Sequence, residues 1–359
     1  MIPSKKDALS IKDIARSANV SHSTVSRALR HSPLVNADTA ERIRRIAAQS
    51  NFRVSAVGRS LATGRTYSIG VVVSSIADPF IAEVVSGLEE VANARGYSVI
   101  LSTSKGDPDR EIKLVQAFEE RRVDGLVLSG SRLGPIYTPL LADMQIPMVS
   151  INNEQAGDFA YSIVVDNAAA SQTAIQFLGQ LGHRRIAYIG NRLGFQLDAA
   201  RERGYRRSLE IQGLPCVPEL VVSGDALPES GMQAMEQLLA LPVPPTAVFC
   251  YNDMTALGAL SAIRRRSLNV PGDISVVGFD DLVMASHTQP PLTTLRQPKQ
   301  LMGRLAGETV LNLLAGSKPP SIRRLQAELI VRESTAPPPA SRAWSDTKLV
   351  SSDRRRDAS

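Results

Sequence analysis

Apolar and polar positions follow two different patterns along this chain of 359 residues. In the first fifty residues, apolar side chains recur three, four and seven positions apart, which is the spacing of one helical face. This spacing predicts three short helices with the buried faces Ile11, Ile14, Ala15 and Ala18; Val25, Ala28 and Leu29; and Ala40, Ile43 and Ala47. Ser10, Ser21 and Asn36 precede the three faces and predict the N-caps of these helices.

Continuous apolar runs replace this pattern after residue 66. Eight runs predict buried strands over 67–75, 97–104, 123–130, 146–152, 161–166, 185–191, 246–253 and 274–281. Amphipathic stretches typical of helices lie between them, and such alternation indicates parallel sheets covered on both faces. The interruption near 153–160 favours two sheets over one. The predicted fold class is α/β: an N-terminal three-helix helix-turn-helix domain, then a core of two doubly wound parallel-sheet subdomains.

The first two predicted helices are separated by barely a turn, as in a helix-turn-helix module. At 100° per residue, Ser23 and Arg27 point away from the apolar face of the second helix. Hydroxyl groups can donate hydrogen bonds to DNA phosphates, and an arginine can donate hydrogen bonds to base edges. The alternative is a solvated helical hairpin with no ligand. Charge favours DNA, because residues 1–65 hold 12 Lys and Arg against 4 Asp and Glu, a net of +8, whereas the whole chain is +6 and the remainder therefore −2.

Several classes of protein are disfavoured by the composition. The amino terminus has no apolar signal region, and no run of about 18 apolar residues exists for a membrane span. Cys216 and Cys250 are too few for a disulfide framework, so we expect a cytoplasmic protein with no metal and no cofactor. No GxSxG, HExxH or P-loop pattern is present, so an enzyme is not expected. A transport receptor built on the same core would need a secretion signal.

Polar residues gather at the ends of the predicted strands, where open α/β sheets bind ligands. These residues are Asp78, Ser129, Ser131, Asn152, Asp166, Asn167, Asn191, Asn252, Asp253, Asp280 and Asp281. Each of them also suits the role of a helix cap. As a set, carboxylates and amides around a cleft favour a hydroxyl-rich small molecule. Phe80 suits either an apolar sugar face or the core.

The order and spacing of several motifs resemble the lactose/galactose-repressor (LacI/GalR) family over about residues 9–333. The motifs are SIKDIARSANVSHSTVSRAL, SAVGRSLATGRTYSIGVVV, DPF, GHRRIAYIG, RERGYRRSL, NDMTALGAL, ISVVGFDD and PPLTTLRQP. The resemblance implies a homodimeric transcriptional regulator, and more specifically a repressor. Its paired N-terminal modules would bind a pseudo-palindromic double-stranded operator, and a small-molecule effector would bind between two subdomains similar to periplasmic binding proteins.

The resemblance also implies domain boundaries. Residues 1–54 would form the DNA-binding domain, 55–65 a hinge helix and linker, and 66–334 the effector-binding and dimerisation core. Within the core, one subdomain would take 67–165 plus 293–320, and the other 166–290 plus 322–333. Residues 335–359 are rich in Pro, Ser, Asp and Arg without periodicity and predict a disordered tail.

DNA-binding residues are implied position by position. His22, Ser23 and Arg27 fall where the family reads bases in the major groove, and Leu61 matches the leucine that enters the minor groove. The implied phosphate contacts are Ser10, Ser21, Thr24 and Ser26.

Effector-binding residues are implied in the same way at Asp78, Phe80, Arg201, Asn252 and Asp280, and the strand-end pattern adds Asp166. Arg201 would supply a fixed cation, so a sugar, a sugar acid and a sugar phosphate all remain open as effectors; its alternative is an exposed arginine on a basic helix. The single Trp of the chain is Trp344, in the predicted tail. Some members of the family carry a Trp that can stack on a sugar, and its absence from the core here argues against a galactoside as the effector.

Overall fold

A computed structural model describes residues 10–29, 32–50, 52, 60, 63–131, 141, 143–144, 146–153, 161–193 and 195–339. The chain divides into two compact units, Met1–Tyr67 and Ser68–Ser359, and each is described by itself. Leu61, most of the predicted hinge at 55–65 and the end of the predicted tail lie outside the described residues.

The first unit contains the predicted three helices, which we call the helical module. Its helices are α1 (Ile11–Ser17), α2 (His22–Leu29) and α3 (Ala37–Gln49). Ser10 and Asp13 form a capping box at the start of α1, so local hydrogen bonds define where this helix begins. Val25, Ala28 and Ile43 are fully buried, which confirms the predicted apolar faces.

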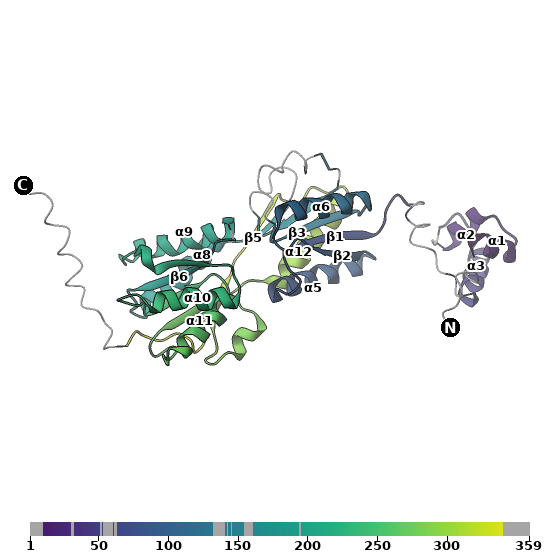
Figure 1. Cartoon of the computed structure of the whole chain (residues 1–359). Coiled ribbons are helices and arrows are strands. Elements are labelled where there is room, and N and C mark those ends of the chain that lie inside the picture. Colours follow the sequence, from purple (N-terminus) through teal and green to yellow (C-terminus); the bar gives the residue numbers. More distant parts are fainter. Residues whose placement is uncertain are drawn as a thin grey trace, which may run out of the picture. The chain divides into compact units, whose positions relative to one another are not determined.

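The second unit contains two six-stranded sheets (Figure 1). The first sheet has the order β11-β5-β4-β3-β1-β2, and the second has the order β12-β10-β9-β8-β6-β7. The strands are β1 (Ser68–Val73), β2 (Ser98–Thr103), β3 (Gly125–Ser129), β4 (Met148–Ile151), β5 (Tyr161–Val165), β6 (Ile186–Asn191), β7 (Val221–Gly224), β8 (Ala247–Cys250), β9 (Ser275–Asp280), β10 (Thr293–Arg296), β11 (Ile322–Leu325) and β12 (Glu328–Ile330). All pairs are parallel except β10 with β12.

Helices cover both faces of each sheet, as the apolar strands predicted. The helices are α5 (Pro79–Ala94), α6 (Pro108–Glu120), α8 (Asn167–Gln180), α9 (Phe195–Ile211), α10 (Pro228–Leu239), α11 (Asp253–Arg265) and α12 (Lys299–Leu314), with short 3₁₀ turns at Pro218–Leu220 and Val283–His287. In the first sheet, α5 packs on α12 and α6 packs on β1. In the second, α10 pairs with α11 and α8 pairs with α9, each pair over its own apolar core.

The predicted division of the last hundred residues was wrong in two places. Strand β10, at 293–296, was assigned to the first subdomain, but it pairs with β9 and β12 in the second sheet. Strand β11, at 322–325, was assigned to the second subdomain, but it pairs with β5 in the first sheet. In both cases the backbone hydrogen bonds between strands show to which sheet the strand belongs. The chain therefore crosses between the sheets after β5, between β10 and α12, and between β11 and β12.

The disordered tail was predicted to begin at residue 335, but the folded core extends beyond this position. Ala336 N–H donates to Ser275 Oγ at 3.1 Å, and its carbonyl lies 2.9 Å from His183 Nε2. Thr335 lies 3.0 Å from Thr293, hydroxyl to hydroxyl. These bonds hold residues 335–336 against the second sheet, so the folded core extends past 334.

Candidate functional site

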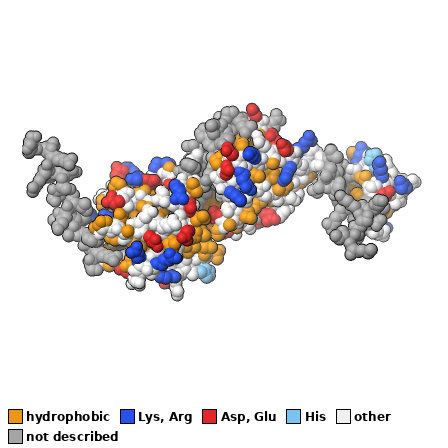
Figure 2. Space-filling view, in the orientation of Figure 1, with side chains coloured by type: hydrophobic (Ala, Val, Ile, Leu, Met, Phe, Trp, Pro, Cys, Tyr) orange, Lys and Arg blue, Asp and Glu red, His pale blue; other side chains and the backbone are white. Residues whose placement is uncertain are grey.

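The outward face of α2 presents the side chains that were predicted to contact DNA. His22, Ser23 and Arg27 are exposed, on the side opposite buried Val25 and Ala28. Figure 2 shows Lys, Arg and His side chains on the visible surface of the helical module. This face is therefore accessible to a polyanion such as DNA. Its cationic side chains lie in water, so the affinity of such binding would depend strongly on salt concentration.

Hydroxyl groups cluster where α2 begins. Ser21 Oγ accepts a hydrogen bond from Thr24 N–H at 3.1 Å, and lies 2.7 Å from Ser23 Oγ and 2.8 Å from Thr24 Oγ1. Ser21 is thus the N-cap of α2, and the hydroxyls lie at the positive end of the helix dipole, which suits a phosphate.

Two other predicted phosphate contacts differ in their surroundings. Ser10 is exposed, and its hydroxyl donates to the Asp13 carboxylate at 2.6 Å within the capping box of α1. Ser26 is half-buried on α2. Their contacts with DNA stay predictions, as does that of Leu61, which lies outside the described residues.

The second unit holds a cavity of about 960 Å³ at the carboxyl ends of the strands of both sheets. The first sheet contributes residues that follow β1, β2, β3 and β4, and the second contributes residues that follow or end β6, β7, β8, β9 and β10. This is the location that open α/β sheets use for ligands. Five of the six predicted effector-binding residues line the cavity: Asp78, Phe80, Arg201, Asn252 and Asp280.

The first sheet supplies Asp78 and Phe80 at the start of α5. Asp78 Oδ1 accepts from Phe80 N–H at 2.9 Å, so this carboxylate caps the helix and borders the cavity at once. Burial raises the pKa of Asp78 above its ordinary value, and the bond from Phe80 opposes that rise. The ring of Phe80 is buried in the lining.

The second sheet supplies Arg201 from α9, and its guanidinium is held by several groups. Arg201 is 2% exposed, which rules out the alternative of an exposed basic helix residue. Its Nε donates to Asn167 Oδ1 at 2.9 Å, and its Nη1 donates to the Tyr251 carbonyl. The guanidinium carbon lies 3.7 Å from the centre of the Phe279 ring and 4.4 Å from that of Tyr251. Its orientation is therefore fixed before any ligand binds.

Asn252 and Asp280 border the cavity beside Arg201. Asn252 Oδ1 accepts from Thr255 N–H at 2.9 Å and caps α11, so the cap and the lining roles coexist here too. Asp280 accepts from Gln297 Nε2 at 2.6 Å. Burial raises the pKa of Asp280 well above its ordinary value; Arg201 opposes this rise, whereas Asp253 and Asp78 add to it.

The backbone at Asp280 has an unusual conformation that Lys299 supports. Asp280 and Asp281 have φ angles of 121° and 52°, which non-glycine residues rarely adopt. Lys299, 5% exposed at the start of α12, donates through Nζ to both of their carbonyls at 2.7 Å. The same Nζ lies 3.4 Å from Glu83 of α5. One buried ammonium thus joins the end of β9 to a helix of the first sheet.

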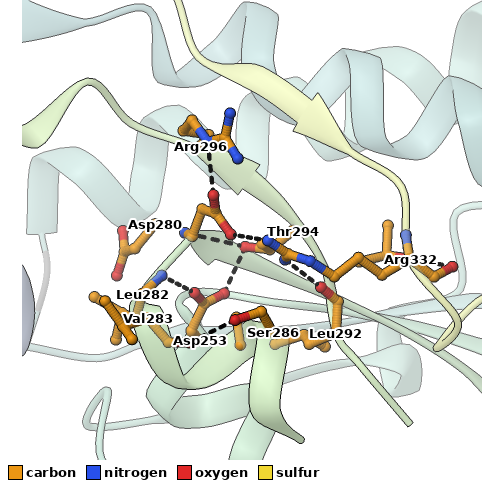
Figure 3. A network of polar contacts seen from close by, with 12 residues as sticks. Asp253, Asp280, Leu282, Val283, Ser286, Leu292, Thr294, Arg296 and Arg332 are labelled. Atoms are coloured by element: carbon orange, nitrogen blue, oxygen red, sulfur yellow. Dashed lines mark hydrogen bonds and ion pairs between the residues drawn. The ribbon is translucent and has the colours of Figure 1, made fainter.

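A second polar network fixes the chain around the end of β9 (Figure 3). Asp253 lies between Thr294, whose hydroxyl donates to it at 2.5 Å, and Leu282, whose N–H donates at 2.7 Å. Burial raises the pKa of Asp253 to about 7, although both hydrogen bonds oppose the rise. Asp281 pairs with Arg296 at 2.7 Å and with Arg332 at 2.6 Å. These neighbours of Asn252 and Asp280 serve the fold and do not line the cavity.

Asp166 was predicted to bind the effector, and the structure does not bring it to the cavity. Its Oδ1 accepts from Ala169 N–H at 3.0 Å and caps α8. Asp166 is not among the residues that line the cavity, and the chain crosses to the second sheet after it. The structure thus places Asp166 as the cap of α8, outside the lining of the cavity, and gives its predicted effector contact no support.

Gln297 lines the cavity and was not predicted. It follows β10 directly, so the strand-end rule would have identified it had β10 been recognised. Its Oε1 and the Oδ1 of Asn152 are buried without a hydrogen-bond partner among the described residues. Lys105, Asp225 and Tyr251 are further unpredicted lining residues.

Comparison with known proteins agrees with this architecture. A family model described as "Bacterial regulatory proteins, lacI family" matches residues 10–55, and one described as "Periplasmic binding protein-like domain" matches 175–335. The HTH-type transcriptional repressor CytR of Escherichia coli strain K12 is 36% identical over 333 residues, covering 92% of this chain and 97% of that protein.

Two solved structures extend the likeness. A lac repressor dimer bound to operator and the anti-inducer ONPF has a TM-score of 0.83 at 28% identity, covering 92% of this chain and 99% of that one. A complex of the transcriptional regulator CelR with cellobiose has a TM-score of 0.70 at 30% identity, covering 91% and 99%. The identity extends over nearly the whole of each relative. The chain therefore belongs to the lacI family of bacterial regulatory proteins.

Proposed function

We propose that this DNA-binding transcriptional regulator is a repressor that binds a pseudo-palindromic operator as a homodimer. A small polyhydroxylated molecule bound in the cavity controls that binding. The proposal rests above all on the joining of two features in one chain: a helical module with an exposed basic face, and a cavity bordered by buried polar groups from both sheets. The lac repressor relative was solved as a dimer on operator DNA, and the CelR relative with a sugar.

At the DNA, His22, Ser23 and Arg27 are proposed to contact base edges, and Ser10, Ser21, Thr24 and Ser26 to contact phosphates. Exposure of the α2 face supports the base contacts, and the hydroxyl cluster at Ser21 supports the phosphate contacts. Leu61 is proposed to enter the minor groove from the 55–65 segment, at the centre of the operator.

In the cavity, Asp78, Phe80, Arg201, Asn252 and Asp280 are proposed to contact the effector. A ligand that touches both sheets favours one arrangement of the two subdomains over others, because it binds them with different affinity. The three crossings of the chain between the sheets are where such a change would be absorbed. The protein would act on DNA in the cytoplasm without catalysing a reaction.

Selection from a random double-stranded DNA library tests the proposal. The purified full chain should enrich an inverted repeat, and footprinting should place one protomer on each half-site. A metabolite library would then be screened for compounds that change operator affinity at one fixed salt concentration. Failure to enrich any symmetric sequence would contradict operator binding by a dimer.

A further inference from the structure

The crossing between β10 and α12 joins the two subdomains through a very short connection. Strand β10 ends at Arg296 in the second sheet, and α12 begins at Lys299 and packs on α5, β3, β4 and β5 of the first subdomain. Gln297 and Pro298 are the two residues between them. Because a hinge absorbs its motion in a few residues, the contacts around these two decide how far the chain bends here.

The side chain of Lys299 reaches back from α12 to the second sheet. Its Nζ donates to the carbonyls of Asp280 and Asp281, at 2.7 Å each, where β9 ends. Both residues have positive φ angles, and their successive carbonyls converge on this one atom. Such a backbone conformation is unfavourable for residues other than glycine and persists only where surrounding contacts hold it. The end of β9 is therefore built around an ammonium that belongs to the first subdomain.

Further bonds tie the connection itself to these contacts. Gln297 Nε2 donates to Asp280 Oδ1 at 2.6 Å, and Lys299 N–H donates to the Gln297 carbonyl at 2.8 Å. Glu83 of α5 lies 3.4 Å from Lys299 Nζ. The Gln297 and Lys299 side chains are both buried, so an ammonium pulled away from its carbonyls would lose hydrogen bonds where little water can replace them. Bending at this crossing is therefore costly.

The helices α5 and α12 carry this restraint to the first wall of the cavity. A Cβ added at Gly87 of α5 would overlap the Gln300 carbonyl oxygen, and one added at Gly303 of α12 would overlap that of Val84. The two helices thus lie in backbone contact and move as one body. Since Asp78 caps α5 and lines the cavity, the position of α12 also sets the position of that wall.

From these contacts we infer that Lys299 is a positioning residue: its ammonium limits bending at the 297–298 crossing and so sets the spacing between the cavity walls that carry Asp78 and Asp280. Without it, the two subdomains would sample a wider range of arrangements. The consequence for DNA binding rests on the proposed function, in which an effector selects among these arrangements. The arrangement itself can be measured without operator or effector, so this inference and the proposed function can fail separately.

Pulsed electron spin resonance between two spin labels, one on each subdomain, tests the inference. Gln116→Cys on α6 and Gln176→Cys on α8 provide exposed labelling sites, in a Cys216→Ser background because Cys216 is the exposed native thiol. The labelled full chain is diluted into an excess of unlabelled chain, so that distances within one protomer dominate. We expect Lys299→Met to widen the distribution of distances between the labels about twofold relative to the otherwise unchanged chain.

Two controls separate this role from the loss of an ion pair and from a general loss of stability. Arg304→Met removes another ion pair between α12 and α5, with Glu90 at 3.5 Å, within the first subdomain. Leu238→Ala leaves a cavity in the apolar core of the second subdomain and destabilises it. Both controls should keep the distribution of the unchanged chain. An unchanged width in Lys299→Met, or an equal widening in Leu238→Ala, would overturn the inference.

A milder variant keeps the inference testable if Lys299→Met does not fold. Glu83→Gln removes the charge that faces the ammonium from α5 and leaves the carbonyl contacts of Lys299 in place. Its matched control is Glu90→Gln, which neutralises the other acid that pairs with α12 on the same helix. We expect Glu83→Gln to widen the distribution and Glu90→Gln to leave it unchanged. Equal widths in the two variants would overturn the inference.

Discussion

The helical module and the cavity both present charged side chains, but they hold them in opposite ways. In the module, Arg27 is exposed to water on α2, as are His22 and Ser23 on the same helix. At the cavity, Arg201 and Asp280 are buried, and each is hydrogen-bonded to a neighbouring side chain. Exposed cations suit a long polyanion whose counterions are released on binding. Buried polar groups held by hydrogen bonds suit a small molecule that must fit fixed donors and acceptors.

The buried carboxyl groups behind this difference predict an effect of pH on the stability of the second unit. The pKa of Asp253 in the folded chain is about 7, and its ordinary value is 3.8. Between these values the folded chain retains a proton that the unfolded chain has released. The free energy of unfolding should therefore fall as pH rises from 4 to 7, by up to about 4 kcal/mol.

Asp253→Asn isolates that effect. An amide can still accept from Leu282 and donate to Thr294, so both hydrogen bonds are retained. Urea unfolding at several pH values should show a flatter profile for the variant than for the unchanged chain between pH 4 and 7. Parallel profiles would mean that Asp253 is ionised over this whole pH range, and they would contradict the predicted pH dependence of stability.

Removal of the buried ammonium of Lys299 should be the next largest effect. Lys299→Met removes the ammonium that pairs with Glu83 and donates to the carbonyls of Asp280 and Asp281, which should cost about 3 kcal/mol of unfolding free energy. Lys113→Met on α6 is the control, because Lys113 is exposed and should change stability by less than about 0.5 kcal/mol. Equal small losses in both would show that the Lys299 contacts contribute little.

In the module, Arg27→Ala tests the exposed side of the comparison. A bidentate contact with guanine contributes about 1–3 kcal/mol of discrimination between bases. The variant should lose preference for operator over random DNA while its salt dependence stays nearly unchanged. Arg45→Ala on α3, exposed and paired with Glu41, should keep that preference. An equal loss of affinity for operator and for random DNA would instead indicate that Arg27 contacts a phosphate.

The same contrast explains what could be predicted from the sequence. The caps at Ser10, Ser21 and Asn36 depend on residues within a few positions, so local spacing sufficed. The eight apolar runs predicted eight strands correctly, but β7, β10, β11 and β12 are short and partly polar, and pattern alone did not identify them.

The candidate site required distant contacts. Arg201 is buried because Phe279, Tyr251 and Asn167 surround it, and all three come from other elements. Asp166 shares the strand-end pattern with Asp280, yet Asp166 caps α8 and is not among the residues that line the cavity. Sequence pattern identifies polar residues at strand ends, and tertiary packing selects among them.

Control of operator binding through the cavity is tested most directly at Asp280. Asp280→Asn keeps an acceptor for Gln297 and introduces one of the residue types that most often adopt a positive φ, but it replaces the second carboxyl oxygen, which a ligand could use, with an amide nitrogen. Operator titrations would be run on both proteins, with and without the effector found by screening, at one salt concentration. We predict that the effector shifts operator affinity of the unchanged chain about 5- to 150-fold. The variant should lose that shift at the same effector concentration and keep its effector-free operator affinity within about twofold. An undiminished shift in Asp280→Asn would contradict control of DNA binding through this cavity.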